Sequence, residues 1–270
     1  MWNPDRFFTW CAVYTGCLFH VAALVSAVCL VVMAAVAFRV SAGEGAAQHG
    51  SHAMRVLIVA VLLNIISLVH ECGHGLALHR YGGHVREVGV RFVLGWPCWY
   101  CDITESYLLP RLRQRVAVII AGPLFQAVTC AGIILAAGGT DPSAVVVRNT
   151  AAVLGLLTLV NFIPFLRSDG YFLLTEVVGM PNLRTHAWEW LLSRVSRQRM
   201  RAELPSRQCG VIAAYAAMSA VFIGLVVVRA ITTIARALAG QARFSFGTVV
   251  AVLSLIVIAR TMVRDRSVSA

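Results

Sequence analysis

The chain of 270 residues is dominated by long apolar stretches that alternate with short polar or arginine-rich segments. A helix needs roughly 20 apolar residues to cross the hydrocarbon core of a bilayer. Six stretches are long enough, or nearly so, and we predict membrane-spanning helices at residues 12–38, 54–79, 114–138, 144–167, 210–235 and 245–262. The expected fold is therefore an all-α polytopic membrane protein with about six spans.

Composition agrees with this pattern and excludes some classes of protein. Hydrophobic residues make up 59% of the chain and charged residues 13%, whereas a soluble domain is about 25% charged. The net charge of +11 is the balance of 23 arginines against 12 acidic residues, and the arginines lie between the apolar stretches. They are signals of topology and not of a nucleic-acid surface, so we expect no nucleic-acid partner. The eight cysteines lie mostly within apolar stretches and predict no disulfide framework.

Arginines also predict the topology, because positively charged residues concentrate on the cytoplasmic side of a membrane. With six spans, 17 of the 23 arginines lie on the side of the two termini and the two long loops, and 6 lie on the other side. Both termini are therefore expected in the cytoplasm.

Two segments outside the apolar stretches have a character of their own. Residues 84–103 alternate Val, Phe and Arg around a Gly-Trp-Pro break, which predicts a small β-hairpin at the membrane surface. This hairpin can take an unwound peptide as an added strand, or it can only cover the site. Residues 183–207 carry two tryptophans and six arginines. They suit an amphipathic helix on an anionic leaflet, or a solvated basic loop.

The sequence HECGH at residues 70–74 is the strongest chemical signal in the chain. On a helix, His70 and His74 project from the same face one turn apart, and Glu71 lies beside them. This spacing suits two ligands of one zinc ion and a general base. Ionisable groups inside an apolar span are unfavourable and indicate a functional site. We therefore predict that this helix carries half of a metal site.

A catalytic zinc site needs a third protein ligand, and two features compete for this role. Asp169 lies where the fourth predicted helix ends, in the sequence RSDG. Cys98 and Cys101 form a Cys-x-x-Cys pair that can bind zinc or carry out redox chemistry. The topology favours Asp169, because the second and fourth helices both run toward the cytoplasm and bring it to the depth of the histidines.

Together, these motifs resemble the site-2 protease family of intramembrane zinc metalloproteases. The resemblance rests on HECGH at 70–74, AGP at 121–123 and NFIPFLRSDG at 161–170, which fits the family's Asn-x-x-Pro-x-x-x-x-Asp-Gly pattern. Residues 79–102 look similar to bacterial membrane peptidases encoded with ribosomally synthesised, modified peptides. One departure is Gln126, where many members have asparagine.

Together with the predicted spans, the resemblance, which covers the chain from about residue 54 to residue 176, divides the chain into four parts. Residues 1–53 form an N-terminal span with an external loop, and residues 54–176 form a catalytic three-helix core that includes the hairpin. Residues 177–209 form a basic amphipathic cytoplasmic segment, and residues 210–270 form two C-terminal spans. It also implies a location in the bacterial cytoplasmic membrane, with the active site near the cytoplasmic face.

The implied chemistry is peptide hydrolysis with one Zn²⁺ ion per chain. His70, His74 and Asp169 are the implied ligands, and Glu71 is the implied base that takes a proton from water. Five further residues are candidates for contact with the substrate: Cys98, Cys101, Gln126, Asn161 and Pro164. Asn161 and Pro164 are also interpreted as residues that shape the fourth helix around Asp169.

Three functions follow as hypotheses. The first is an intramembrane zinc endopeptidase that removes a leader from a modified-peptide precursor. The second is the same chemistry in signalling, releasing a membrane-tethered regulator. The third is a non-catalytic immunity or export partner, against which the intact Glu71 argues. The expected partners are a peptide or membrane-protein substrate, the lipid bilayer, and a second copy or another membrane component in an oligomer.

Overall fold

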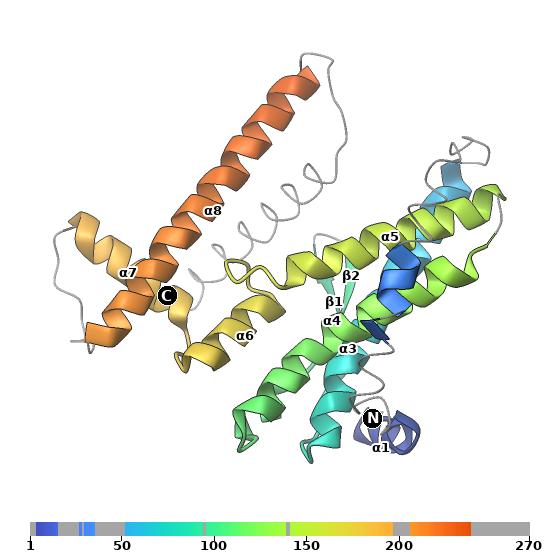
Figure 1. Cartoon of the computed structure of the whole chain (residues 1–270), viewed down its shortest axis with the longest axis horizontal. Coiled ribbons are helices and arrows are strands. Elements are labelled where there is room, and N and C mark those ends of the chain that lie inside the picture. Colours follow the sequence, from blue (N-terminus) through green and yellow to red (C-terminus); the bar gives the residue numbers. More distant parts are fainter. Residues whose placement is uncertain are drawn as a thin grey trace. The chain divides into compact units, whose positions relative to one another are not determined.

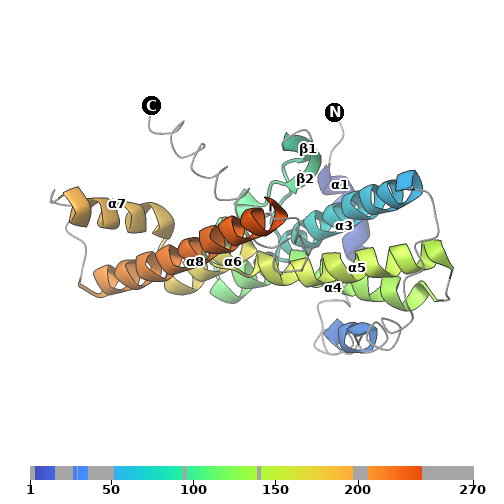
Figure 2. The ribbon, with the colours of Figure 1, turned by 90° about the horizontal axis from the view of Figure 1, so that it is seen from above.

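A computed structural model describes residues 4–15, 27–28, 30–35, 52–93, 96–138, 141–196 and 206–238. The chain forms two compact units, Met1–Asn161 and Phe162–Ala270. Both are mostly helical, and the first also holds a two-stranded sheet (Figures 1 and 2). Four helices in the described part of the chain are long and apolar enough to cross a membrane: Ala53–Arg80, Leu112–Ala136, Pro142–Asn161 and Gln208–Thr233. These four helices fit the prediction of a membrane protein.

Four of the six predicted spans have a counterpart among these helices. They are α3 (His52–Arg80), α4 (Leu112–Ala136), α5 (Pro142–Asn161) and α8 (Ser206–Leu238). The span predicted at residues 245–262 lies outside the described residues, and most of the span predicted at 12–38 does as well. A short helix, α1 (Pro4–Thr15), precedes the latter. Six spans therefore stay a prediction.

The first unit is built on α3, α4 and α5, which pack against one another. In Figure 2, α4 and α5 run alongside each other. The contact between α3 and α4 is close at Gly73, where an added Cβ would lie 2.8 Å from the carbonyl oxygen of Ala121. Small residues let helix backbones approach in this way. This contact brings the HECGH segment of α3 against the AGP segment of α4.

The fourth predicted span ends earlier in the structure than in the prediction. Helix α5 stops at Asn161, and the expected end at residue 167 is wrong. Pro164 explains the difference, because proline has no N–H to donate and disfavours helical geometry in the residue before it. At the other end, the Asp141 carboxylate accepts a hydrogen bond from the Ser143 N–H at 3.1 Å and caps the helix.

The predicted hairpin is present. Strand β1 (Val88–Val93) pairs with β2 (Trp96–Cys101) in an antiparallel sheet that packs against α3. A short 3₁₀ helix, η2 (Thr104–Leu108), then leads into α4. Val88 and Cys101 are opposite each other in the register and pack on the core of the first unit. This packing fixes the hairpin beside the helix that carries the two histidines.

The second unit contains α6 (Asp169–Val178), α7 (Leu183–Ser196) and α8. Helix α6 ends at Gly179, which adopts a left-handed conformation with φ 68°, as glycine does most readily. The buried core of this unit brings together Tyr171, Leu183, Ile212 and Tyr215. The segment that suited either an amphipathic helix or a solvated loop is helical from residue 183 to residue 196.

Candidate metal centre

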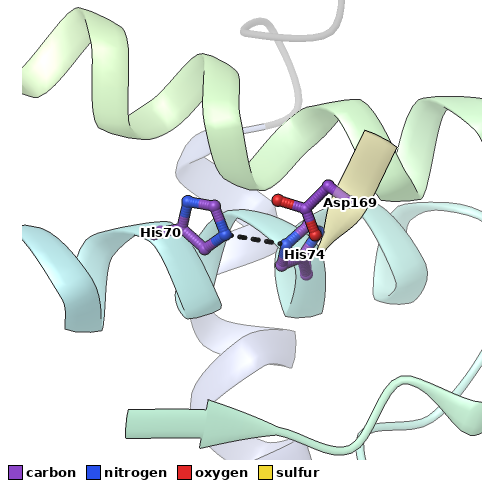
Figure 3. Close-up of side chains that lie close together, drawn as sticks. All are labelled: His70, His74 and Asp169. Carbon is purple, nitrogen blue, oxygen red and sulfur yellow. Dashed lines mark hydrogen bonds between the residues drawn. The ribbon is translucent and has the colours of Figure 1, made fainter. Parts of the chain in front are cut away.

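The two histidines of the HECGH segment face each other on α3. Their Nε2 atoms lie 3.2 Å apart, as Figure 3 shows. His74 is 4% exposed, and His70 is half-buried. The four-residue spacing therefore places both rings on one face of the helix, as the sequence predicted.

A backbone carbonyl determines the protonation of His74. Its Nδ1 atom lies 2.8 Å from the carbonyl oxygen of Val118 on α4. A carbonyl oxygen can only accept a hydrogen bond, so the proton of the neutral imidazole is on Nδ1. The Nε2 atom of His74 therefore carries a lone pair, the form in which histidine binds a metal.

Gln126 determines the protonation of His70 in the same way. Its Nε2 amide donates to the carbonyl oxygen of Leu154 at 2.9 Å, which turns its Oε1 atom toward His70. The Nδ1 atom of His70 lies 2.8 Å from this Oε1 atom and must donate to it. The Asn161 side-chain amide, 3.5 Å away, donates to the same oxygen. Gln126 thus links α3, α4 and α5 and leaves a lone pair on Nε2 of His70.

The two lone pairs point at a shared position. Facing lone pairs 3.2 Å apart repel each other unless a cation lies between them. Two nitrogens bound at about 2.0–2.1 Å to one tetrahedral zinc ion are themselves about 3.3–3.4 Å apart. Hydrogen bonds from the second ring nitrogen to a carbonyl or an amide oxygen are also typical of metal-binding histidines. The separation of the two Nε2 atoms is therefore compatible with one shared metal ion.

A third donor is available from Asp169. One ligand atom from each of His70, His74 and Asp169 lies within 4.8 Å of the others (Figure 3). The sequence placed Asp169 at the end of the fourth helix, whereas it is the first residue of α6. A carboxylate is favoured at this end of a helix by the helix dipole. The cluster can bind a metal ion, with two nitrogen donors and one oxygen donor.

Two glycines make room for these ligands. A Cβ atom at Gly122 would clash with the imidazole of His74, so the ring lies directly on the backbone of α4. A Cβ atom at Gly170 would clash with the backbone of Phe162, which explains the glycine that follows Asp169. The glycines of the AGP and DG motifs therefore make room for two candidate metal ligands.

Glu71 is held by the hairpin. Its Oε2 atom accepts a hydrogen bond of 3.0 Å from the backbone N–H of Cys101, the last residue of β2. Hydrogen bonds to an ionised carboxylate are stronger than those between neutral groups. The hairpin thus orients the candidate base beside the two histidines.

The Cys-x-x-Cys alternative does not fit the strand that contains it. Residues three apart in a strand point to opposite faces and are about 10 Å apart, so Cys98 and Cys101 can neither form a disulfide nor bind one zinc ion together. Burial also raises the pKa of the Cys101 thiol, and the Glu71 carboxylate raises it further. This disfavours the thiolate that zinc binding requires.

Among the remaining candidates, Pro164 accepts a hydrogen bond of 3.1 Å from the Tyr215 hydroxyl through its carbonyl oxygen.

Sequence reasoning missed most of the support that α4 gives to the site. Val118, Gly122 and Gln126 lie at intervals of four residues on one face of α4, opposite His70 and His74. The interval itself was a usable signal, because it marks a helical face. Gln126, a predicted substrate contact, makes hydrogen bonds to His70, Leu154 and Asn161, and its contact with a substrate stays a prediction.

No protein-family model, curated protein or solved structure matches this chain.

Proposed function

We propose that the chain is an intramembrane zinc endopeptidase. The observation that carries the proposal is the cluster of His70, His74 and Asp169. The Nε2 atoms of the two histidines lie 3.2 Å apart on a candidate membrane span, and the neighbouring Glu71 is held by the Cys101 N–H. Two histidines, one carboxylate ligand and an adjacent glutamate base suit zinc-dependent hydrolysis. When bound, zinc supplies a Lewis acid and makes water a nucleophile near neutral pH.

Glu71 is the proposed base of this reaction. Its carboxylate takes a proton from the attacking water and later gives a proton to the leaving amine. The Cys101 N–H holds one carboxylate oxygen, so the side chain does not have to be oriented again in each turnover. His70 and His74 keep their protons on Nδ1 because of Gln126 and Val118, and their Nε2 atoms stay available as ligands.

The edge of β2 that faces away from β1 is the proposed place for the substrate backbone. The Asp102 N–H donates a hydrogen bond to the Glu87 carbonyl of the facing segment, so residues 87 and 102 form a hydrogen-bonded pair. In an antiparallel ladder, hydrogen-bonded and non-hydrogen-bonded pairs alternate. Trp99 and Cys101 therefore belong to non-hydrogen-bonded pairs, and their backbone N–H and C=O groups point away from β1. On that side, Glu71 accepts the hydrogen bond from the Cys101 N–H. A peptide added as a strand beside Trp99 would expose its carbonyls next to the base.

Leader removal from a modified-peptide precursor is the substrate assignment that we favour. It rests on the resemblance of residues 79–102 to peptidases of that kind. Release of a membrane-tethered regulator uses the same residues and is the second candidate. The oriented Glu71 disfavours a purely structural partner, because a scaffold has no use for a base held at this position.

Cleavage in a co-expression system tests the proposed function. The chain is produced in bacterial membranes together with a candidate modified-peptide precursor, and the products are analysed by mass spectrometry. We expect one new cleavage site that is lost when membranes are treated with a zinc chelator and restored by added zinc. Cleavage that persists in the chelator would contradict a zinc enzyme.

Removal of the Gln126 amide should weaken metal binding. Gln126→Leu takes away the acceptor for His70 Nδ1 and leaves the Leu154 carbonyl without its side-chain donor. We expect zinc affinity to fall by about 10–100-fold, the usual effect of losing such a supporting residue. Competition with a fluorescent chelator measures the affinity. Gln114→Leu, near the start of the same helix, is the control, and an equal loss in both variants would argue against the proposed role.

The backbone N–H of Cys101 should matter more than its thiol. Proline is tolerated at an edge-strand position whose N–H makes no hydrogen bond to the neighbouring strand. Cys101→Pro therefore removes the N–H that donates a hydrogen bond to Glu71 and leaves the pairing with β1 in place. We expect kcat/KM for the precursor to fall by about 10–100-fold, the usual value of a hydrogen bond to a charged group. Cys101→Ala keeps the N–H and should retain activity. Equal activities of the two variants would show that the hairpin does not orient Glu71.

A further inference from the structure

Helix α1 packs on the first unit through a single face. Pro4 and Phe8 are buried, Asp5 and Cys11 are half-buried, and Trp10 is 63% exposed. The four buried and half-buried residues share one side of the helix, and α1 contacts α3 (Figure 1). Because the contact is one face of a helix of 12 residues, few side chains decide whether α1 stays docked.

Phe8 is the apolar part of this contact. It is 1% exposed and belongs to the same buried cluster as Leu78 and Val85. A Cβ atom at Gly75 would lie 2.5 Å from the Cζ atom of Phe8, so the ring lies directly on the backbone of α3. Gly75 follows His74 in the chain. The docked helix therefore covers α3 at the residue next to a candidate metal ligand.

Asp5 is the polar part of the contact. Its Oδ2 atom accepts a hydrogen bond of 2.9 Å from the Nδ1 atom of His84, and its Oδ1 atom accepts one of 3.4 Å from the Val85 N–H. The Oδ1 atom also lies 3.5 Å from the Nδ1 atom of His79 on α3. One carboxylate thus connects α1 to the end of α3 and to the segment between α3 and the hairpin.

Two carboxylates lie around His84, whose side chain is 67% exposed. One is that of Asp5, and the other is that of Glu105 on η2, which accepts the His84 backbone N–H at 2.9 Å. Glu105 also pairs with Arg86 at 3.2 Å, and His79 contacts Asp5 from α3. The imidazole is open to solvent, and the hydrogen bond and the charge of Asp5 raise the pKa of His84 above its ordinary value of 6.5.

The pKa of Asp5 changes in the opposite direction. Burial alone would raise it, but the hydrogen bonds from His84 and Val85 outweigh this effect and lower it. Asp5 is therefore ionised and His84 protonated at pH values between the two pKa values. A pKa that docking raises stabilises the docked form at low pH, and this contribution is lost as the pH rises through the raised pKa. The neutral imidazole can still donate from Nδ1, so docking weakens above that pH and does not disappear.

We propose that Asp5 and His84 form a pH-sensitive latch that holds α1 on α3, tight when His84 is protonated and loose when it is neutral. Histidine is the side chain whose charge ordinarily changes near neutral pH. Phe8 does not titrate and supplies the constant part of the docking free energy. Opening of the latch uncovers Gly75, so the latch links pH to the turn of α3 that carries His74.

Hydrogen exchange of the purified chain in lipid nanodiscs measures how often α1 opens. Exchange of residues 4–15 and of the segment that contains Val85 is followed by mass spectrometry at about pH 6 and about pH 8.5. Each rate is divided by the intrinsic rate at the same pH. We expect wild-type α1 to open about two- to fivefold more often at the higher pH, the usual effect of an exposed ion pair.

Four variants separate the latch from the fold. His84→Asn keeps a donor near the position of Nδ1 but cannot be protonated, and Asp5→Asn removes the anion, so both should open equally often at the two pH values. His186→Asn is the matched control, because His186 faces Glu189 at 3.9 Å on α7, and it should keep the wild-type pH dependence. Phe8→Ala should open α1 more than about 100-fold more often at both pH values, as expected for a lost buried ring.

Equal opening of the wild type at the two pH values would overturn the proposal. Wild-type pH dependence in His84→Asn or Asp5→Asn would overturn it as well. Exchange of wild-type α1 as fast as in Phe8→Ala would show that this helix is not docked, with the same consequence. The readout depends on neither zinc nor peptide cleavage, so the latch can fail while the proposed enzyme activity holds.

Discussion

Replacement of Glu71 by glutamine is expected to reduce peptide cleavage by about 10²–10⁴-fold, the usual contribution of a general base. Glutamine has nearly the same shape, and its side-chain oxygen can still accept the hydrogen bond that Cys101 donates. It cannot take a proton from water. The loss should therefore appear in kcat, while the precursor continues to bind. Cleavage of the co-expressed precursor, measured by mass spectrometry, checks this result.

Metal content separates this effect from a loss of the site. Glu71→Gln should retain as much zinc as the wild type, because its side chain is not one of the three clustered donors. Glu189→Gln, at an exposed position on α7, should keep full activity. Undiminished cleavage by Glu71→Gln would contradict the proposed mechanism.

Replacement of Gly122 by alanine is expected to abolish zinc binding, although it adds only one methyl group. The new Cβ would clash with the imidazole of His74. The ring is held on its other side by the Val118 carbonyl at 2.8 Å, so it cannot move and keep that hydrogen bond. Both the position and the protonation of this ligand should be lost. Zinc per chain and cleavage of the precursor should fall together.

The control for this substitution lies on the same helix. A Cβ atom at Gly132 of α4 would have no neighbour within 4 Å, so Gly132→Ala should leave zinc content and cleavage unchanged. Alanine is also the better helix former, by about 1 kcal/mol. A Gly122→Ala protein with normal zinc content would show that the His74 ring does not lie on this glycine when the metal is bound.

The predictions that the structure confirms depend on local periodicity. Four spans, at residues 54–79, 114–138, 144–167 and 210–235, could be located because an apolar stretch of this length has few alternatives to a helix. The hairpin followed from alternating residues around a turn signal. The shared face of His70 and His74 follows from the helical repeat alone.

The parts that sequence reasoning missed depend on contacts between helices. The partners of His70 and His74 on α4 follow from the register in which two antiparallel helices pack, and no local pattern gives that register. The bond from Gln126 to the Leu154 carbonyl of a third helix is likewise not visible in the sequence, so the support that Gln126 gives to His70 could not be predicted. Apolar residues continue beyond Asn161 and predict an end of this helix near residue 167, whereas α5 ends at Asn161. Pro164 disfavours a helix beyond that point.

The zinc content of the purified full-length chain is the most direct test of the proposed centre. We propose that His70, His74 and Asp169 hold one ion between them, so elemental analysis should find one zinc per chain in the wild type. His74→Ala and Asp169→Ala should each lose most of it, while His186→Ala, outside this cluster, should not. X-ray absorption of the wild type should give two nitrogen ligands and at least one oxygen ligand at about 2.0–2.2 Å. A wild-type chain without zinc, or a His74→Ala chain that keeps it, would contradict this account.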